Sequence, residues 1–450
     1  MRVWQYLLWH AWVVMLLCSP ALGGERPHIV FLLADDQRAD TIAALGNSAV
    51  ETPHLDELVR SGFAFRNAYC MGSTSAAVCN PSRHMLLSGM SLYRYDPMRR
   101  EGTLGDLMSR AGYVTWHTGK RGNTAREYHQ AFQHSTYLDD EKERTSGHHG
   151  KEAVDRAIEF LNSGWDRKRP LFLYLAFEGP HDPRVADERW MRLYGRDQLA
   201  LPRNFMPFHP FNNGELLVRD ERLAPWPRTP EIVRSHLHDY YACITSIDHQ
   251  IGRIRGTLQE LGELENTIFI FSSDHGLAIG SHGLFGKQNL YEHSMKAPLI
   301  LAGPGIPHGQ SESFAYLFDI LPTIAELAEA DVPAALDGQS LLPIVRGERD
   351  QVRDTIFLTY RQVQRAVRQG DWKLIRYPQV DVTQLFNLRL DPHELTNLAD
   401  DPSQAERVNH LLAQLASEQR RFGDNTPLTV GSPQEGVVDE AYFEAASRGP

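Results

Sequence analysis

The stretch HIVFLLADD, residues 28–36, joins an apolar run to two consecutive aspartates. A short apolar run that stops at polar residues is typical of a strand buried on both faces, as in a parallel sheet. Ligands of open parallel sheets bind beyond the carboxyl ends of the strands. The stretch therefore predicts a central strand that brings Asp35 and Asp36 to a ligand-binding edge.

Similar runs recur along the chain and alternate with helical patterns. The runs are GYVTWHTGK (112–120), PLFLYLAFEGPHD (170–182), NTIFIFSSDHG (266–276) and APLILAGPG (297–305). The helical patterns lie at 52–62, 102–112, 150–164, 232–262 and 318–330. We therefore expect an α/β fold with a large, mostly parallel sheet sandwiched by helices.

The pattern changes after residue 350. Short strand-like runs lie at 355–360, 365–377 and 383–391, and a helical pattern follows at 405–423. These runs predict a short antiparallel sheet with one helix. We expect a catalytic domain over 25–350, an α+β C-terminal subdomain over 351–425 and an extended tail over 426–450.

The N-terminus has the layout of a secretory signal peptide. An early cation, Arg2, precedes an apolar run that ends in small residues near Gly23 and Gly24. This run is short for a bilayer. We expect residues 1–24 to be removed and the protein to be exported, periplasmic or secreted, with no stable membrane anchor.

Charge and cysteine content narrow the function classes. The formal net charge of −11 does not favour binding to nucleic acid or to anionic membranes. An anionic substrate would need a local cluster of lysines and arginines. Without Cys18 of the leader, three cysteines remain, too few for a disulfide framework. Cys70 and Cys243 are expected to be buried thiols or one bridge.

Polar residues follow four of the predicted strands. They are Asp35 and Asp36, Lys120, His181 and Asp182, and Asp274 and His275. Carboxylate oxygens suit Ca²⁺ or Mg²⁺, and one histidine widens the choice to Mn²⁺ or Zn²⁺. These strand ends predict a metal site at the sheet edge.

The stretch CNPSRHMLLSG, residues 79–89, places a thiol at the start of a predicted short helix. Pro81 suits a first helical turn and Gly89 a helix end. The helix dipole would lower the pKa of the Cys79 thiol. A plain cysteine nucleophile is one hypothesis, but it has no evident histidine–asparagine partners and does not explain the metal-type residues.

The same stretch resembles the signature of type I, formylglycine-dependent sulfatases of the alkaline phosphatase superfamily, with Ser88 in place of threonine. Other segments also look like family segments, in family order: ADDQR, TGK, PHDPR, SSDHG, GKQNLYEHSMKAPLIL, DILPTIAELA and GDWKLIRY. The chain is similar to bacterial polysaccharide and iduronate-type sulfatases. The resemblance implies an alkaline phosphatase-like fold.

The resemblance also implies that Cys79 is a precursor. A formylglycine-generating, sulfatase-maturing enzyme would read Pro81 and Arg83 and convert Cys79 to formylglycine. One hydroxyl of the hydrated aldehyde would attack sulfur, and the other would later expel sulfate.

Matching motifs imply roles for further residues. The metal ligands would be Asp35, Asp36, Asp274, His275 and the modified Cys79, with Ca²⁺ usual and Mg²⁺ or Mn²⁺ possible. Arg83 would hold the diol, Lys120 and Lys287 would bind the sulfate, and His181 would act as general acid with a pKa near neutrality. Arg184, Arg361 and Arg365 are candidates for substrate binding.

One position departs from the family pattern. Family members commonly have a histidine shortly after the first lysine, where this chain has Gly122. That histidine usually helps deprotonate the second hydroxyl. Asn123, His117 or His129 could fill the role, which stays open.

The sequence thus predicts a sulfatase that hydrolyses a sulfate ester, on a sulfated carbohydrate. Two alternatives remain. One is a phosphonate monoester hydrolase or phosphodiesterase of the same superfamily, and the other is a weakly active protein that binds sulfated glycans. The sulfated sugar, its sulfated carbon, exo or endo action and the oligomeric state are not predicted.

Overall fold

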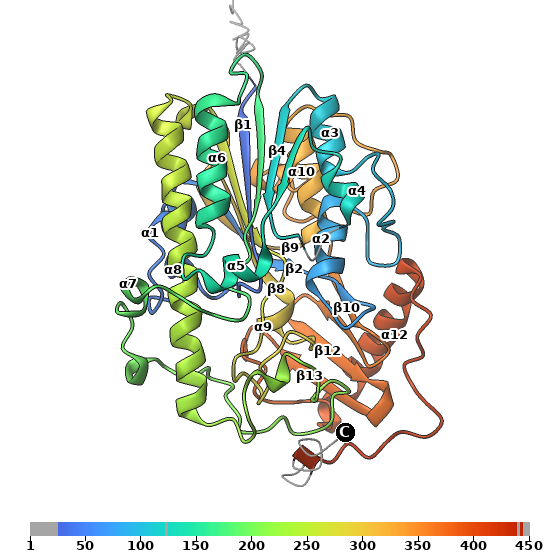
Figure 1. Ribbon diagram of the computed structural model, residues 1–450. Coiled ribbons are helices and arrows are strands. Elements are labelled where there is room, and N and C mark those ends of the chain that lie inside the picture. Colours follow the sequence, from blue (N-terminus) through green and yellow to red (C-terminus); the bar gives the residue numbers. More distant parts are fainter. Residues whose placement is uncertain (1–25, 122–124, 439–441, 444–450) are drawn as a thin grey trace, which may run out of the picture.

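The computed structural model describes residues 26–121, 125–438 and 442–443. The predicted signal peptide, 1–24, lies outside these residues. An eight-stranded sheet forms the centre of the molecule (Figure 1). Its strands, in spatial order, are β5 (His134–Tyr137), β4 (Val114–Gly119), β6 (Leu171–Ala176), β1 (His28–Ala34), β7 (Thr267–Ser273), β8 (Lys296–Ala302), β2 (Phe63–Tyr69) and β9 (Gly309–Tyr316).

Most strand pairs in this sheet are parallel, as expected, but β8 is antiparallel to both of its neighbours, β7 and β2. The expectation that the run at 297–305 is a parallel strand was wrong, because an apolar run carries no sign of direction. The strands β2, β5 and β9 were not predicted. β5 and half of β9 are only partly buried, so neither shows the continuous apolar run of a central strand.

Strand β1 is buried on both faces, as its sequence predicts. Ile29, Phe31 and Leu33 enter one hydrophobic core, and the alternate residues enter a second core on the opposite face. The side-chain period of two gives each face of the sheet its own core.

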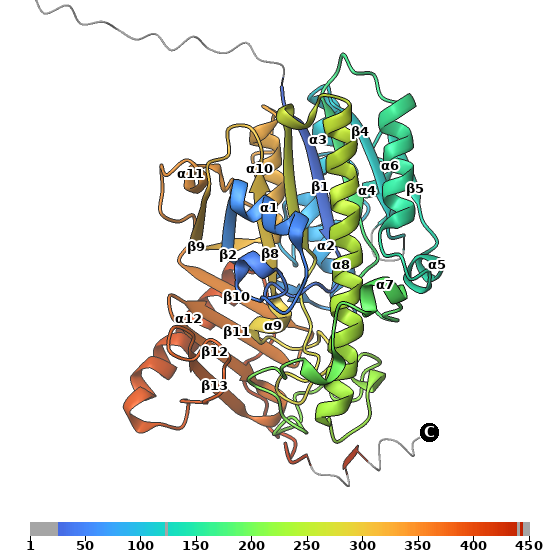
Figure 2. The same ribbon diagram turned by 90° about the vertical axis from the view of Figure 1, so that its left-hand side faces the viewer.

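Helices cover both faces of the large sheet (Figure 2). The helices α1 (Pro53–Ser61), α6 (Lys151–Ser163) and α8 (Pro230–Glu260) contribute to one core. The helices α2 (Cys79–Ser88), α3 (Leu104–Arg110) and α10 (Ile320–Leu327) contribute to the other. Short helices lie in the connections: α4 (Arg126–His129), α5 (Asp140–Thr145), α7 (Glu188–Met191), α9 (Glu292–Met295) and α11 (Leu342–Val345).

A second, five-stranded sheet takes four of its strands from the part of the chain that follows the large sheet. Its order is β13 (Val382–Asn387), β12 (Trp372–Tyr377), β11 (Gln364–Gln369), β10 (Thr355–Tyr360) and β3 (Gly72–Ser73), and α12 (Ala405–Phe422) packs on it. The fold class is therefore confirmed, namely a large mixed sheet with helices and a C-terminal sheet with one helix.

Strand β3 links the second sheet to the start of α2. It pairs in parallel with β10, and the Arg361 amide donates to the Ser73 carbonyl. The proposed 351–425 subdomain therefore takes one strand from residues that lie just before Cys79. This link places the second sheet beside the predicted site.

The structure bears on the expectations about a membrane anchor and about the cysteines. Among the described residues, the structure contains no helix that is long and apolar enough to cross a membrane. Cys70, Cys79 and Cys243 are free, buried thiols, so no bridge joins Cys70 to Cys243.

Candidate active site

The register of β1 against β7 brings two acidic strand ends together. Ala34 is paired with Ser273, so Asp35 and Asp274 leave adjacent parallel strands at the same level. The Asp36 amide donates to Asp274 Oδ1 at 3.1 Å. Asp36 has a φ of 67°, a left-handed conformation that costs a non-glycine residue energy and is enriched at functional sites. The predicted convergence of strand ends is present.

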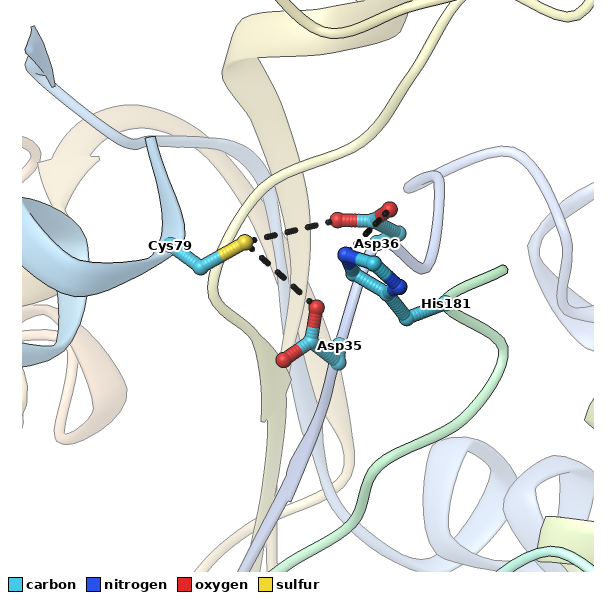
Figure 3. Close-up of side chains that lie close together, drawn as sticks. All are labelled: Asp35, Asp36, Cys79 and His181. Carbon is cyan, nitrogen blue, oxygen red and sulfur yellow. Dashed lines mark hydrogen bonds and ion pairs between the residues drawn. The ribbon is translucent and has the colours of Figure 1, made fainter. Parts of the chain in front are cut away.

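Helix α2 places Cys79 at this edge. The helix begins at Cys79, no side chain caps its N-terminus, and Gly89 ends it with φ 67°. The Sγ atom lies 3.1 Å from His275 Nε2 and 3.1 Å from Lys287 Nζ. Asp35 Oδ1 and Asp36 Oδ1 are 3.5 and 3.7 Å away (Figure 3). Acids, an imidazole and an ammonium therefore surround the position of the predicted nucleophile.

The environment of Cys79 does not favour a plain thiolate. Burial raises the pKa of the Cys79 thiol well above its usual value, and the Asp35 carboxylate raises it further, although Lys287 acts in the opposite direction. The expected lowering of this pKa by the helix dipole was wrong, because burial and the Asp35 carboxylate together outweigh it. These surroundings favour the protonated thiol over a thiolate.

Arg83 connects the two acidic strand ends from α2. Its Nη2 donates to Asp35 Oδ2 at 2.7 Å, and its Nε donates to Asp274 Oδ2 at 3.0 Å. All three side chains are fully buried. In this arrangement Arg83 fixes the orientation of two predicted metal ligands.

Two buried lysines reach the site from different parts of the chain. Lys120 Nζ, after β4, lies 2.5 Å from Asp35 Oδ2, and Lys287 Nζ lies 2.8 Å from Asp36 Oδ1. Burial opposes the ionised form of Asp35, yet Lys120 and Arg83 hold its pKa well below the usual range. Burial likewise opposes the charge of Lys287, but Asp36 and Cys79 raise its pKa. For Lys120 too, burial opposes the charge and Asp35 raises the pKa above its usual value, so both lysines stay charged beside the two aspartates.

His181 faces Asp36 from the loop after β6. Its Nε2 is 4.0 Å from Asp36 Oδ2, and its Nδ1 is 2.7 Å from the Asp182 carbonyl oxygen (Figure 3). Burial, followed by Lys287 and Lys120, lowers the pKa of His181 to about 3. The expected pKa near neutrality was wrong for the protein without substrate, because the ring is buried and two lysines lie near it.

The donor set fits a divalent cation. Two groups of four residues each place one possible ligand atom per residue within 4.8 Å of the other three. The first group is Asp35, Asp36, Cys79 and His181, and the second is Asp36, Cys79, Asp274 and His275. His275 Nδ1 bonds the Gly276 carbonyl oxygen at 2.8 Å, which turns Nε2 toward Cys79. Backbone support of this kind is usual for a metal-binding histidine. The carboxylate oxygens suit a hard cation.

Two acidic residues near the lysines were not predicted. Glu178 Oε2 lies 3.8 Å from Lys120 Nζ, and burial raises the pKa of Glu178 to about 9. Asp220 Oδ2 lies 4.0 Å from Lys287 Nζ and accepts from Gln288 Nε2 at 2.7 Å. The place of Glu178 just after a strand could have indicated it. Asp220 lies in the long connection between β6 and α8, where no sequence motif marks it as a site residue.

The three candidate substrate arginines differ in their surroundings. Arg184 is half-buried over the Tyr240 ring, and its Nε donates to the Pro180 carbonyl. Arg361 is half-exposed, pairs with Glu215 at 2.6 Å and lines an open pocket of about 560 Å³. Arg365 lines the same pocket but is buried and paired with Asp424 at 2.5 Å. The charge of Arg365 is thus already neutralised, which argues against the predicted substrate role.

The position that departs from the family pattern, Gly122, lies outside the described residues, as does Asn123. His117 and His129 stack on each other with ring centroids 4.3 Å apart, and His117 also stacks on Tyr174. Burial lowers the pKa of His117 to about 3. Both rings therefore belong to a buried aromatic cluster, which argues against either as the missing base.

A buried site that gathers carboxylates, histidines and lysines around Cys79 suits a hydrolase of anionic esters. The sulfatase family model matches residues 27–330, and the C-terminal model of N-sulphoglucosamine sulphohydrolase matches residues 280–421. The chain belongs to the sulfatase family and is a sulfuric ester hydrolase.

Curated relatives span most of the chain. An N-acetylglucosamine-6-O-sulfatase of Bacteroides thetaiotaomicron is 25% identical, over 90% of this chain and 88% of the relative. An arylsulfatase of Clostridium perfringens is 27% identical, over 91% and 98%.

Solved structures share the fold. One is a complex with the substrate D-glucosamine-2-N,6-O-disulfate, with a TM-score of 0.75, 23% identity and coverage of 90% of this chain and 99% of the other. A phosphonate monoester hydrolase of Agrobacterium radiobacter has a TM-score of 0.74, 21% identity and coverage of 92% and 100%.

Proposed function

We propose that this sulfatase removes sulfate from a sulfated carbohydrate. The observation that supports this most is a pair of buried lysines near Cys79 in a chain of the sulfatase family. Lys287 contacts the sulfur directly, and Lys120 contacts Asp35, whose other oxygen lies 3.5 Å from the sulfur. The named activity of the Bacteroides relative and the glucosamine disulfate bound in a similar structure favour an amino sugar as the substrate.

The nucleophile in this proposal is the hydrate of formylglycine at position 79. A maturation enzyme, with an oxidant of its own, would remove two electrons from Cys79, release the sulfur as sulfide and leave an aldehyde, which water hydrates. The Sγ atom marks where the reacting hydroxyl would lie, between His275, Lys287 and the two aspartates. A second hydroxyl on the same carbon would let the residue release sulfate without attack by water.

Asp35, Asp36, Asp274 and His275 would hold a divalent cation, for which we propose Ca²⁺, with Mg²⁺ or Mn²⁺ as alternatives. The cation would supply positive charge that lowers the pKa of the hydroxyl nucleophile and neutralises sulfate oxygens. Arg83 would keep Asp35 and Asp274 in position for it.

The remaining charges would act on the substrate. Lys120 and Lys287 would bind sulfate oxygens and stabilise the charge that develops in the transition state. His181 would donate a proton to the departing sugar oxygen through Nε2. A bound sulfate group would oppose the effect of the two lysines and raise the pKa of His181 from its low value toward the working range. Arg184 and Arg361 are proposed to contact the sugar at the rim.

Export to the periplasm or the medium belongs to the same proposal. It rests on the leader-like residues 1–24 and agrees with a polysaccharide substrate, which cells degrade outside the cytoplasm. The partners would be the sulfated glycan and the maturation enzyme.

A substrate panel tests the function. Turnover of 4-nitrophenyl sulfate, phosphate and phenylphosphonate is compared, followed by glucosamine sulfated at nitrogen or at carbon 6. We expect sulfate to exceed the phosphorus esters in kcat/KM, and release of sulfate from at least one sulfated sugar. A preference for the phosphonate would support the alternative hydrolase, and binding of sulfated sugars without release would indicate a glycan-binding protein.

The His181→Ala variant should separate substrates by leaving group. A sugar alkoxide needs a proton as it departs, whereas 4-nitrophenolate is stable without one. We expect kcat for a sugar sulfate to fall by about 10²–10⁴-fold, with a much smaller loss for 4-nitrophenyl sulfate. Equal losses for both substrates, measured by sulfate release, would contradict a role as general acid.

A further inference from the structure

A second cluster of possible metal ligands lies outside the proposed catalytic site. It consists of His282, His293 and Glu394, each of which offers one donor atom within 4.8 Å of the other two. All three side chains are buried. His282 follows β7 in a loop, His293 belongs to α9, and Glu394 follows β13. The cluster therefore joins the large sheet to the C-terminal segment.

The two histidines have nitrogen atoms with no hydrogen bond to any described residue. These atoms are His282 Nε2 and both ring nitrogens of His293, and all three are buried. A buried polar atom without a partner costs free energy, so such atoms are rare in native proteins. An imidazole ring in its neutral form carries one nitrogen lone pair that can bind a metal ion.

Neighbouring groups hold the side chains in place. Glu394 Oε1 accepts from Lys373 Nζ at 2.8 Å, and Oε2 accepts from the Glu292 amide at 2.9 Å. Asn204 Nδ2 donates to the His393 carbonyl at 3.0 Å beside the cluster. Support of this type from outside the ligand set is typical of metal ligands.

The backbone at two of the three residues is strained. His282 has a φ of 53° and Glu394 a φ of 57°, both in the left-handed region. Asp36, a proposed catalytic metal ligand, is in the same region with a φ of 67°. Strained residues of this kind cluster at functional sites, where the fold holds a side chain in one position.

A cavity of about 170 Å³ gives access to two of the three residues, His293 and Glu394, and not to His282. Its other charged lining residues are Asp40, Glu292, Arg38, Arg66 and Lys296. The space exceeds what one water molecule needs, so an ion could enter and keep a water ligand.

Aromatic stacking alone does not account for the cluster. The His282 ring stacks on Tyr291 with centroids 4.0 Å apart, and His293 stacks on the same ring at 5.6 Å. Stacking explains the orientation of the rings but leaves their nitrogens without partners. The nearby cations oppose a hard metal ion that is bound mainly by charge, and the acids Asp40, Glu292 and Glu394 offset them only in part. These cations are Arg38, Arg66, Lys296 and Lys373. A metal held by imidazole nitrogens suits this balance better.

We propose that His282, His293 and Glu394 form a second metal site, for Zn²⁺ or a similar borderline transition metal, with water as a fourth ligand. Two neutral histidines and one carboxylate are a known ligand set for zinc. Because Glu394 comes from the segment after β13, the ion would clamp that segment onto the large sheet and stabilise the fold. It would take no part in sulfate ester hydrolysis.

Metal analysis of the full-length protein in excess Ca²⁺ tests this proposal, since Ca²⁺ should occupy the oxygen-rich catalytic site. After dialysis against Zn²⁺, we expect about one zinc per chain in the wild type and its near-complete loss in His293→Gln. His308→Gln, which changes an exposed histidine, and Asp274→Asn, which changes a catalytic ligand, should both keep the zinc. The melting temperature of the wild type should fall on chelation of zinc, and that of His293→Gln should not change.

Two readouts remain if His293→Gln does not fold. Glu394→Gln keeps the shape of the carboxylate and should bind zinc more weakly. Co²⁺ added to the Ca²⁺-saturated wild type should give the intense visible absorption of a four-coordinate site. A wild type that binds no zinc and shows no such absorption would overturn the proposal, as would equal zinc content in the wild type and a folded His293→Gln variant.

Discussion

Cys79→Ala is expected to lower kcat for every sulfate ester by about 10³-fold or more, because it removes the atom proposed to attack sulfur. The loss should exceed that of any lysine variant, since each lysine supplies only part of the charge around the ester. Cys243→Ala is the matched control, because Cys243 is also a buried free thiol but lies in α8. It should keep nearly full activity.

Mass spectrometry of the peptide that contains Cys79 separates the two possible nucleophiles. We expect the active wild type to carry an aldehyde in place of the thiol. A Cys79→Ser variant should accept one sulfate group and retain it, because serine has no second hydroxyl to expel it. Active protein in which every Cys79 is an unmodified thiol would refute the formylglycine mechanism and leave the family membership untouched.

Arg83→Met is expected to lower the free energy of unfolding by about 3–5 kcal/mol, as removal of one partner from a buried ion pair does. The substitution leaves Asp35 and Asp274, both fully buried, without the guanidinium that they share. Activity should fall as well, because the two carboxylates would no longer be held in position. Urea denaturation of the wild type and the variant measures the loss of stability.

Two comparisons sharpen the Arg83 experiment. Arg346→Ala removes a surface cation that pairs with Glu326 at 2.6 Å, and it should cost only about 0–1 kcal/mol. The loss in Arg83→Met should be smaller in Ca²⁺ than in chelator, because the cation would compensate the two carboxylates. A loss below about 1 kcal/mol in chelator would contradict the proposed structural role of Arg83.

The sequence predicted the central strands and the residues that follow them. HIVFLLADD and NTIFIFSSDHG are apolar runs with polar ends, and parallel pairing of β1 with β7 places Asp35 beside Asp274. Two C-terminal runs, 355–360 and 383–391, correspond to β10 and β13, but the run predicted at 365–377 is two strands, β11 and β12, that pair antiparallel. The direction of β8 was not predicted, since hydrophobic periodicity is the same for both directions of a strand.

The roles of individual charges were harder to predict, because they depend on neighbours distant in the sequence. His181 was expected to have a pKa near neutrality, yet burial, followed by Lys287 and Lys120, lowers its pKa to about 3. The thiol of Cys79 was expected to be acidic, yet burial raises its pKa. Arg365 was a substrate candidate, but Asp424 in the C-terminal segment neutralises it.

The amino-acid sequence by itself determined the α/β fold class, five strands of the large sheet and most of the charged residues that gather at its carboxyl edge. Local periodicity and short motifs suffice for these features, because each is encoded within about ten neighbouring residues. Only the tertiary structure decided which carboxylate pairs with which cation, which histidines are neutral, and that His282, His293 and Glu394 lie together. The physical reason is that charge and desolvation act between residues that the fold brings close, whatever their separation along the chain.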